Sequence, residues 1–387
     1  MKTTISLCWI VELCLFSIGL AWAAKDAPAK KYLLYVGTYT KGESRGIYAY
    51  RFDPKSGTAA SLGLAAETEN PSFLAVDPGQ KLLYAVNELT RYKGAASGAV
   101  TAFAIDPATG KLSALNQVAS RGADPCYIAF DQTGNYVLVA NYTGGSLAIF
   151  PVSKEGHLGE ATAFVQHAGV GRNPERQESP HAHWIETSAD NRFAIAADLG
   201  LDRLLVYRFD ASQGSLTPNT PPYAKVEAGA GPRHVAFAPN GKFAYVIDEL
   251  GSTINAFSYD AKGGVLDPLQ TISTLPAGFK GTNDTAEIHV HPNGRFLFAS
   301  NRGHDSIAVF SIDAKAGRLT LVSHVSTQGK TPRNFEIDPT GTRLFVANQD
   351  SGNIVIFRID AETGRLTPTG QELKVPSPVS LRFVAND

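Results

Sequence analysis

Short apolar stretches, each followed by a polar turn, recur along the whole chain. In one repeated segment an apolar stretch leads into a turn that usually begins with aspartate and ends with glycine. These glycines lie about 50 residues apart, at Gly57, Gly110, Gly156, Gly214, Gly264, Gly317 and Gly364. A second segment repeats in phase with the first, as in "AFDQTGNYVLVAN", "AFAPNGKFAYVID" and "EIDPTGTRLFVAN". No long stretch shows helical periodicity, so the pattern predicts β-strands alone.

Repeats of this length that contain several strands are typical of β-propellers, in which each repeat forms one blade. Seven copies predict an all-β, seven-bladed β-propeller with four-stranded antiparallel blades, which forms a single domain over residues 24–387. The first copy lacks an inner strand, whereas residues 379–384 form a spare strand at the end of the chain. We therefore expect residues 379–384 to pair with residues 32–37, which closes the ring and leaves no open sheet edge.

Residues 1–23 have the features of a secretory signal peptide. Lys2 is followed by an apolar run from Ile5 to Leu20, and a small–x–small cleavage pattern ends at Ala23. This predicts a periplasmic or secreted protein, with an uncleaved anchor as the alternative. Cys126 is the only cysteine outside this segment, so the fold has no disulfide to rely on. The net charge of −1, from 35 basic and 36 acidic residues, argues against nucleic acid or a membrane surface as a partner.

Alignment of the copies predicts which positions share one face of the propeller. Inner strands begin, and second strands end, on the face opposite the glycine turns. A short polar residue ends each second strand, and its expected role is to hydrogen-bond the backbone there. Two other positions vary between copies: the residue just after each second strand and the residue at the start of each inner strand. They include Arg, His and Glu, which are costly to bury without a partner. The two variable sets are Glu88, Tyr142, Leu199, Glu249, Arg302 and Gln349, and Ser72, Cys126, His183, Arg233, Ala286 and Arg333.

Charged groups from several blades should therefore converge on one mouth of the central channel, as in a small-molecule site. Residues expected to bind a substrate there are His181, His234, Asp198, Glu287, His289, Arg333 and Asn348. His181 and His183 could also ligate a metal, but no third ligand has suitable spacing, so neither a metal nor another cofactor is expected. His291 is predicted to be an exposed turn residue, and Cys126 a small buried residue without a partner for nucleophilic catalysis.

Five segments together resemble the seven-bladed propeller lactonases, a family that includes propeller-type 6-phosphogluconolactonases and a fungal carboxy-muconate cyclase. They are "YVGTYTKGESRGIYAYRFDPKSG", "SPHAHW", "GPRHVAF", "DELGSTI" and "PRNFEIDPTGTRLFVANQDSGNI". The resemblance covers almost the whole chain after the leader. It implies lactone chemistry, with a catalytic group formed by His183 (or His181), Arg233, Glu249 and Arg302.

The leading hypothesis is a lactonase for a small sugar-derived or carboxylated lactone. Glu249 or His183 would act as general base on water, while Arg233 and Arg302 would hold the anionic part of the substrate and the developing oxyanion. A serine nucleophile is not expected, because the chain has no G-x-S-x-G elbow. The alternatives are a propeller that binds a ligand or a protein without catalysis, and a cyclase that forms a muconate-type lactone. Export also conflicts with a phosphorylated substrate, which belongs in the cytoplasm.

Overall fold

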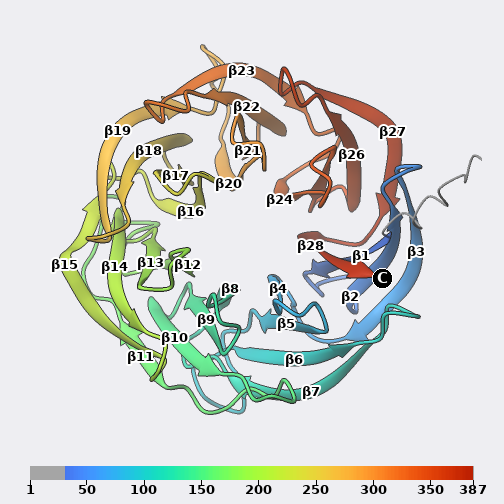
Figure 1. The fold of residues 1–387 in the computed structure, drawn as a ribbon, viewed down its shortest axis with the longest axis horizontal. Coiled ribbons are helices and arrows are strands. Elements are labelled where there is room, and N and C mark those ends of the chain that lie inside the picture. Colours follow the sequence, from blue (N-terminus) through green and yellow to red (C-terminus); the bar gives the residue numbers. More distant parts are fainter. Residues whose placement is uncertain (1–30, 387) are drawn as a thin grey trace, which may run out of the picture.

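The computed structural model describes residues 31–386, and the leader expected at residues 1–23 lies outside them. The described residues form seven four-stranded antiparallel sheets arranged as blades around one axis, with no helix among them (Figure 1). They accordingly contain no helix long and apolar enough to cross a membrane. The predicted all-β, seven-bladed propeller is confirmed.

Each blade contributes one strand to each of four concentric layers (Figure 1). The inner strands of blades 1 to 7 are β28 (Pro378–Asn386), β4 (Leu74–Val76), β8 (Pro125–Phe130), β12 (Ala182–Thr187), β16 (Pro232–Phe237), β20 (Asp284–Val290) and β24 (Pro332–Ile337). The second strands are β1 (Lys31–Thr38), β5 (Leu82–Asn87), β9 (Tyr136–Asn141), β13 (Phe193–Asp198), β17 (Phe243–Asp248), β21 (Phe296–Arg302) and β25 (Arg343–Asn348). The third strands are β2 (Gly46–Asp53), β6 (Ala99–Ile105), β10 (Ser146–Pro151), β14 (Arg203–Asp210), β18 (Thr253–Asp260), β22 (Ser306–Ile312) and β26 (Asn353–Ile359). The outer strands are β3 (Thr58–Glu67), β7 (Leu112–Ala119), β11 (Ala163–Gln166), β15 (Ser215–Lys225), β19 (Val265–Ser273), β23 (Leu319–Ser326) and β27 (Leu366–Lys374).

The core lies between the blades, where each sheet packs both of its faces against its neighbours. β13 and β17 are buried along their whole length, which explains why second strands read as continuous apolar runs rather than alternating ones. The turn glycines serve this packing. Gly264 has φ of 65°, and a Cβ atom there would lie 2.5 Å from Cδ1 of Phe193 in the preceding blade. A side chain at this position would clash, so the glycine repeat reports blade packing as well as turn geometry.

The last strand closes the ring as predicted. β28 pairs antiparallel with β1, from Lys31 opposite Asn386 to Thr38 opposite Pro378. The side chains of Val379, Leu381 and Val384 are at most 2% exposed. The first and last described residues are therefore held in the same sheet, and the four strands of blade 1 come from both ends of the chain.

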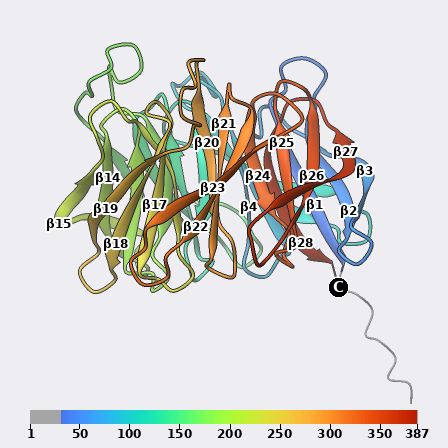
Figure 2. The same ribbon diagram turned by 90° about the horizontal axis from the view of Figure 1, so that it is seen from above.

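The two faces of the disc differ in their connections. The face where inner strands begin and second strands end, which we call the mouth face, carries the longer loops, at the top of Figure 2. The longest of these connects β11 to β12 through residues 167–181. The opposite face, which we call the turn face, carries the glycine turns. His291 lies on this face as predicted, but it is 4% exposed and donates a hydrogen bond to the Gly341 carbonyl, so its predicted exposure was wrong.

Candidate functional site

β-Bulges occur where the inner strands begin on the mouth face. Pairing between the inner and second strands skips one inner-strand residue in blades 3, 4, 5 and 7. A bulge takes the side chain of its extra residue out of the normal alternation of the strand, and bulges are frequent beside active sites. Four blades thus present a bulge residue at the same level of the ring. These residues are Cys126, His183, Arg233 and Arg333.

A carboxylate surrounded by three guanidinium groups is the most highly charged feature of the mouth face. Glu249 directly follows β17, and its Oε2 lies 2.8 Å from Nε of Arg233 and 2.8 Å from Nη2 of Arg302. Its Oε1 accepts a hydrogen bond of 2.5 Å from Nη2 of Arg176, which belongs to the β11–β12 loop. Arg233 and Arg302 also donate to backbone carbonyls of β20, which fixes their orientation. Three of the four predicted catalytic residues are therefore in direct contact.

The arginines keep Glu249 ionised. Burial by itself raises the pKa of Glu249, but the charges of Arg302, Arg233 and Arg176 outweigh burial and hold this pKa far below its usual value. A carboxylate in this state is a weak acceptor of protons. Burial and the charges of neighbouring arginines lower the pKa of Arg233 to about 10, so this group stays charged at neutral pH. The cluster has more positive than negative charge, which suits an anion or an oxygen that becomes negative during a reaction.

His183 lies beside this cluster as a neutral imidazole. Its Nδ1 is 3.7 Å from Sγ of Cys126, and its ring centroid is 5.1 Å from that of His234. Burial, followed by the charge of Arg233, lowers the pKa of His183 well below its usual value. Cys126 is buried as predicted, although a histidine does lie beside it, and burial raises the pKa of its thiol. The two groups therefore form a neutral pair, not the thiolate–imidazolium pair of a cysteine nucleophile.

Aromatic side chains complete the mouth face. The ring of His181 stacks on that of Tyr142 with centroids 4.5 Å apart. The guanidinium carbon of Arg333 lies 5.4 Å from the ring centroid of Tyr39. The phenol of Tyr39 lies 3.0 and 2.9 Å from the two carboxylate oxygens of Glu88. His181 and Arg333 thus lie at the mouth, as expected for residues that bind a substrate.

One layer below the bulges, five side chains fill the axis and form what we call the plug: Phe73, Tyr127, His234, Glu287 and Asn334. The rings of Phe73, Tyr127 and His234 come from three blades, and their centroids lie 4.3 to 5.7 Å apart. Oε1 of Glu287 lies 2.8 Å from Nδ1 of His234, and its Oε2 accepts a 2.5 Å hydrogen bond from Asn334. All five residues are at most 4% exposed. His234 and Glu287, which were expected to bind substrate, are instead paired inside the plug.

A separate cavity of about 330 Å³ lies below the plug, toward the turn face. His289 lines it together with Glu336 and Arg382, whose Nη1 donates a 2.7 Å hydrogen bond to Oε2 of Glu336. His289 is two residues further along β20 than Glu287, and the sequence alignment did not separate these depths. His289 thus lies on the turn-face side of the plug, away from the bulge residues, and its expected role in substrate binding stays a prediction.

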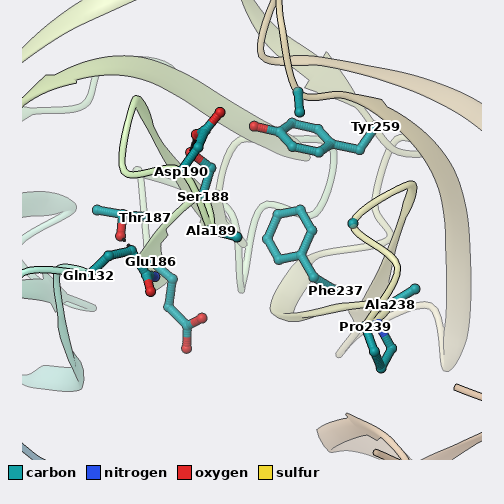
Figure 3. A pocket seen from close by; sticks show the side chains of 12 residues that line it. Gln132, Glu186, Thr187, Ser188, Ala189, Asp190, Phe237, Ala238, Pro239 and Tyr259 are labelled. Atoms are coloured by element: carbon teal, nitrogen blue, oxygen red, sulfur yellow. Dashed lines mark hydrogen bonds between the residues drawn. The ribbon is translucent and has the colours of Figure 1, made fainter. Parts of the chain in front are cut away.

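Another cavity, of about 370 Å³, opens on the turn face between blades 4 and 5 (Figure 3). It is lined by the ends of β12 and β16 and by the turns that follow them, with the ring of Phe237 between the two segments. On β12 the bulge residue His183 and Glu186, the first residue of this strand that lines the cavity, are three residues apart, which is about 10 Å along an extended strand. None of the predicted site residues lines it.

Two further predicted substrate-binding residues are structural. Asp198 is fully buried, and its oxygens accept hydrogen bonds from the backbone of His181 and from Nδ1 of His167. Asn348 is also fully buried and donates to the carbonyl of Thr327. Both end a second strand, where a short polar side chain ties neighbouring backbone segments together. Both are buried at the ends of their strands, and Oδ1 of Asn348 has no hydrogen-bond partner among residues 31–386.

The sequence reasoning missed Arg176, and it placed Glu88 and Tyr142 in a variable set without selecting them as site residues. Arg176 lies in the β11–β12 loop, outside the repeated unit, so alignment of the copies gave no signal for it. Glu88 and Tyr142 do occupy the same alignment column as Glu249, and this was the signal that could have selected them. Within residues 31–386 no group of three or more His, Cys, Asp or Glu side chains is arranged to hold a metal ion, and His181 and His183 gain no third ligand.

Comparisons with known proteins cover nearly all of the described residues and agree with one another. Residues 33–383 match the family model described as "Lactonase, 7-bladed beta-propeller". The chain is 39% identical to the 6-phosphogluconolactonase of Bacillus subtilis strain 168 over 308 residues, which is 80% of this chain and 85% of that protein. It resembles the crystal structure of a periplasmic gluconolactonase from Pseudomonas aeruginosa with a TM-score of 0.87 and 37% identity, covering 92% of this chain and all of that one. A putative 6-phosphogluconolactonase from Bacteroides fragilis gives a TM-score of 0.86 and 39% identity, covering 92% of this chain and 98% of that one.

The mouth of this closed propeller thus gathers arginines, a glutamate and a histidine. The proteins that match the chain in sequence and fold include several named as lactonases. The chain belongs to the seven-bladed β-propeller lactonase family. It is a lactone hydrolase.

Proposed function

We propose that this enzyme hydrolyses the ring ester of a small sugar-derived lactone at the mouth face, using His183, Arg233, Glu249 and Arg302. The observation that carries the proposal is the contact between Glu249 and three guanidinium groups beside a neutral imidazole. Ester hydrolysis needs a base that activates water and positive groups where the carbonyl oxygen becomes negative. This cluster supplies both, and the bulges of blades 4 and 5 support two of its members.

His183 is the general base in this proposal. Its neutral ring can accept a proton from water, and Nδ1 faces Cys126, which leaves Nε2 for the water molecule. Arg233 and Arg302 bind the carbonyl oxygen and stabilise the oxyanion. Glu249 holds these arginines in position, because a carboxylate that three guanidinium groups keep ionised has little tendency to take up another proton. Of the two bases considered from the sequence we favour His183, because both carboxylate oxygens of Glu249 are already in contact with guanidinium groups.

Export and family membership together support an unphosphorylated sugar lactone. The leader expected at residues 1–23 would take the enzyme to the periplasm or outside the cell, and one relative is named a periplasmic gluconolactonase. Other relatives are named 6-phosphogluconolactonase, which leaves the phosphorylated lactone as the competing substrate.

The substrate is tested by proton release during hydrolysis of δ-gluconolactone, its 6-phosphate and the aromatic lactone dihydrocoumarin, with and without a chelator. We expect δ-gluconolactone to have the highest kcat/KM and the chelator to have no effect. Mass spectrometry of the protein from its native host should show that residues 1–23 are absent. An intact leader in a cytoplasmic fraction, together with a preference for the phosphate, would reverse the assignment. Binding without turnover would point to the non-catalytic alternative, and lactone formation from an unsaturated diacid to the cyclase.

Glu249 and His183 can be distinguished by the pH dependence of their variants. We expect His183→Asn to lower kcat by about 10²-fold or more and to abolish the acidic limb of the pH–rate profile, because the base is lost. Glu249→Gln should lower kcat/KM by about tenfold or more through misplaced arginines, while the acidic limb remains. His157→Asn and Glu67→Gln, at exposed positions, are the matched controls. Loss of the acidic limb in Glu249→Gln alone would make Glu249 the base.

A further inference from the structure

A second carboxylate occupies the position of Glu249 in another blade. Glu88 directly follows β5 in blade 2, as Glu249 follows β17 in blade 5. Blades 2 and 5 lie on different sides of the axis (Figure 1). The proposed chemistry uses only Glu249, although both carboxylates stand at the same level of the same mouth.

The two carboxylates have opposite surroundings. Three guanidinium groups contact Glu249, whereas no cation among residues 31–386 lies within 4 Å of the Glu88 carboxylate. The phenol of Tyr39 is the group that donates to Glu88, at 3.0 and 2.9 Å from its two oxygens. Burial raises the pKa of Glu88, and the charge of Arg333 opposes this effect only in part. Pairs of carboxylates whose environments push their pKa values apart commonly divide the roles in acid–base catalysis.

Tyr39 and Arg333 connect Glu88 with the bulge residues. The phenol of Tyr39 donates to Glu88, and the guanidinium carbon of Arg333 lies 5.4 Å from the centroid of the same ring. Arg333 is the bulge residue of blade 7, at the same level of the ring as Cys126, whose Sγ is 3.7 Å from Nδ1 of the proposed base. Through Tyr39 and Arg333, Glu88 is therefore placed beside the ring of bulge residues at the mouth.

Arg333 adds a group that is ready to bind a ligand on the same side as Glu88. Its guanidinium lies over the ring of Tyr39 and donates no hydrogen bond to any residue that the structure describes. Arg233, in contrast, is hydrogen-bonded to Glu249 and to β20, and Arg302 is ion-paired with Glu249 and hydrogen-bonded to β20. A substrate between the two sides would thus meet Arg233 and Arg302, which are held by Glu249, on one side. On the other side it would meet the Glu88 carboxyl group and the guanidinium of Arg333.

We propose that Glu88 is the general acid of this enzyme, which protonates the ring oxygen of the lactone as the acyl C–O bond breaks. The inference rests on the proposed lactone hydrolysis. Water loses one proton to His183 as its oxygen forms a bond to the carbonyl carbon. The tetrahedral intermediate then collapses, the ring C–O bond breaks, and the leaving oxygen takes the proton of the Glu88 carboxyl group. Return of the His183 proton to Glu88 through solvent restores the enzyme, and the product is a hydroxy acid.

A lactone with a better leaving group tests this role. Opening δ-gluconolactone releases an aliphatic alkoxide, whereas opening dihydrocoumarin releases a phenol with a pKa of about 10, which needs little help from an acid. We expect Glu88→Gln to lower kcat/KM for δ-gluconolactone by about a hundredfold and that for dihydrocoumarin by less than about tenfold. Glu67→Gln, an exposed glutamate, is the control. Equal losses for both lactones, or no loss for δ-gluconolactone, would overturn the assignment. Absence of hydrolysis by the unaltered enzyme would instead reject the proposed function itself.

The pH–rate profile gives a second readout that applies even if dihydrocoumarin is not a substrate. The charged, titratable and polar groups around Glu88 are Tyr39, Arg333, Asp124 and Ser72. A general acid must be protonated, so kcat/KM should fall as pH rises through the Glu88 pKa, and Glu88→Gln should lack this alkaline limb. Tyr39→Phe removes a hydrogen bond that favours the ionised form, so it should move the limb to higher pH. An unchanged limb in both variants would contradict the role. A merely structural Glu88 would not produce loss of the limb in Glu88→Gln together with a shift to higher pH in Tyr39→Phe.

Discussion

Replacing Arg233 with alanine is expected to lower kcat/KM by at least about a hundredfold, the effect of losing one group that stabilises an oxyanion. Arg233 donates from Nε to Glu249 and from Nη1 to a β20 carbonyl, so its fork is held in place before substrate arrives. A preorganised donor of this kind stabilises the transition state by about 3 kcal/mol. The measurement is kcat/KM for the best lactone of the panel, together with the melting temperature.

Two further variants make the result specific. Arg233→Lys keeps the charge but loses the planar fork, so it should recover only part of the activity. Arg45 is an exposed arginine paired with the exposed Glu67, and Arg45→Ala should leave kcat/KM unchanged. If Arg233→Ala and Arg45→Ala had equal activity, Arg233 would not belong to the reacting centre.

Removal of residues 378–387 is expected to abolish cooperative unfolding of the whole propeller. The truncation removes β28, which pairs with β1 over eight residues of that strand, and it exposes an unpaired sheet edge. Loss of Val379, Leu381 and Val384 alone removes about 5 kcal/mol of apolar burial. This is a large part of the about 5–15 kcal/mol that stabilises a typical folded domain. Circular dichroism during heating measures the effect.

Closure can also be tested by restoring the missing strand. A synthetic peptide of residues 376–387 should bind the truncated chain and raise its melting temperature, because strand addition completes the sheet. As a control, Arg358→Ala changes an exposed residue on β26 and should leave the melting temperature of the intact protein unchanged. A truncated protein that melts within a few degrees of the parent would contradict closure by β28.

Sequence alone predicted the fold well because its determinants are local and repeated. Each glycine turn marks one blade, and the spare strand at the end of the chain follows directly from counting strands. The same alignment placed His183, Arg233, Glu249 and Arg302 on one face, because position along a strand determines which face a residue reaches. This reasoning needed no knowledge of side-chain contacts.

Depth along the axis was not predictable in the same way. Glu287 and His289 belong to one strand, yet one lies in the plug and the other beyond it. The bulges are invisible in the sequence, and they break the alternation that would otherwise decide where a side chain points. Arg176 comes from a loop that no other blade repeats, so only the folded chain shows its contact with Glu249.

The plug has a consequence for how the enzyme completes a cycle. Because the plug lies below the bulges, a lactone hydrolysed at the proposed site would enter from the mouth face, and the hydroxy acid would leave by the same opening. Hydrolysis at the proposed site would also create a carboxylate among arginine side chains, so we expect the product to be held more tightly than a neutral lactone. For the proposed site we therefore expect departure of the acid, rather than opening of the ring, to be the slow step, and accumulated product to compete with fresh substrate for the same opening.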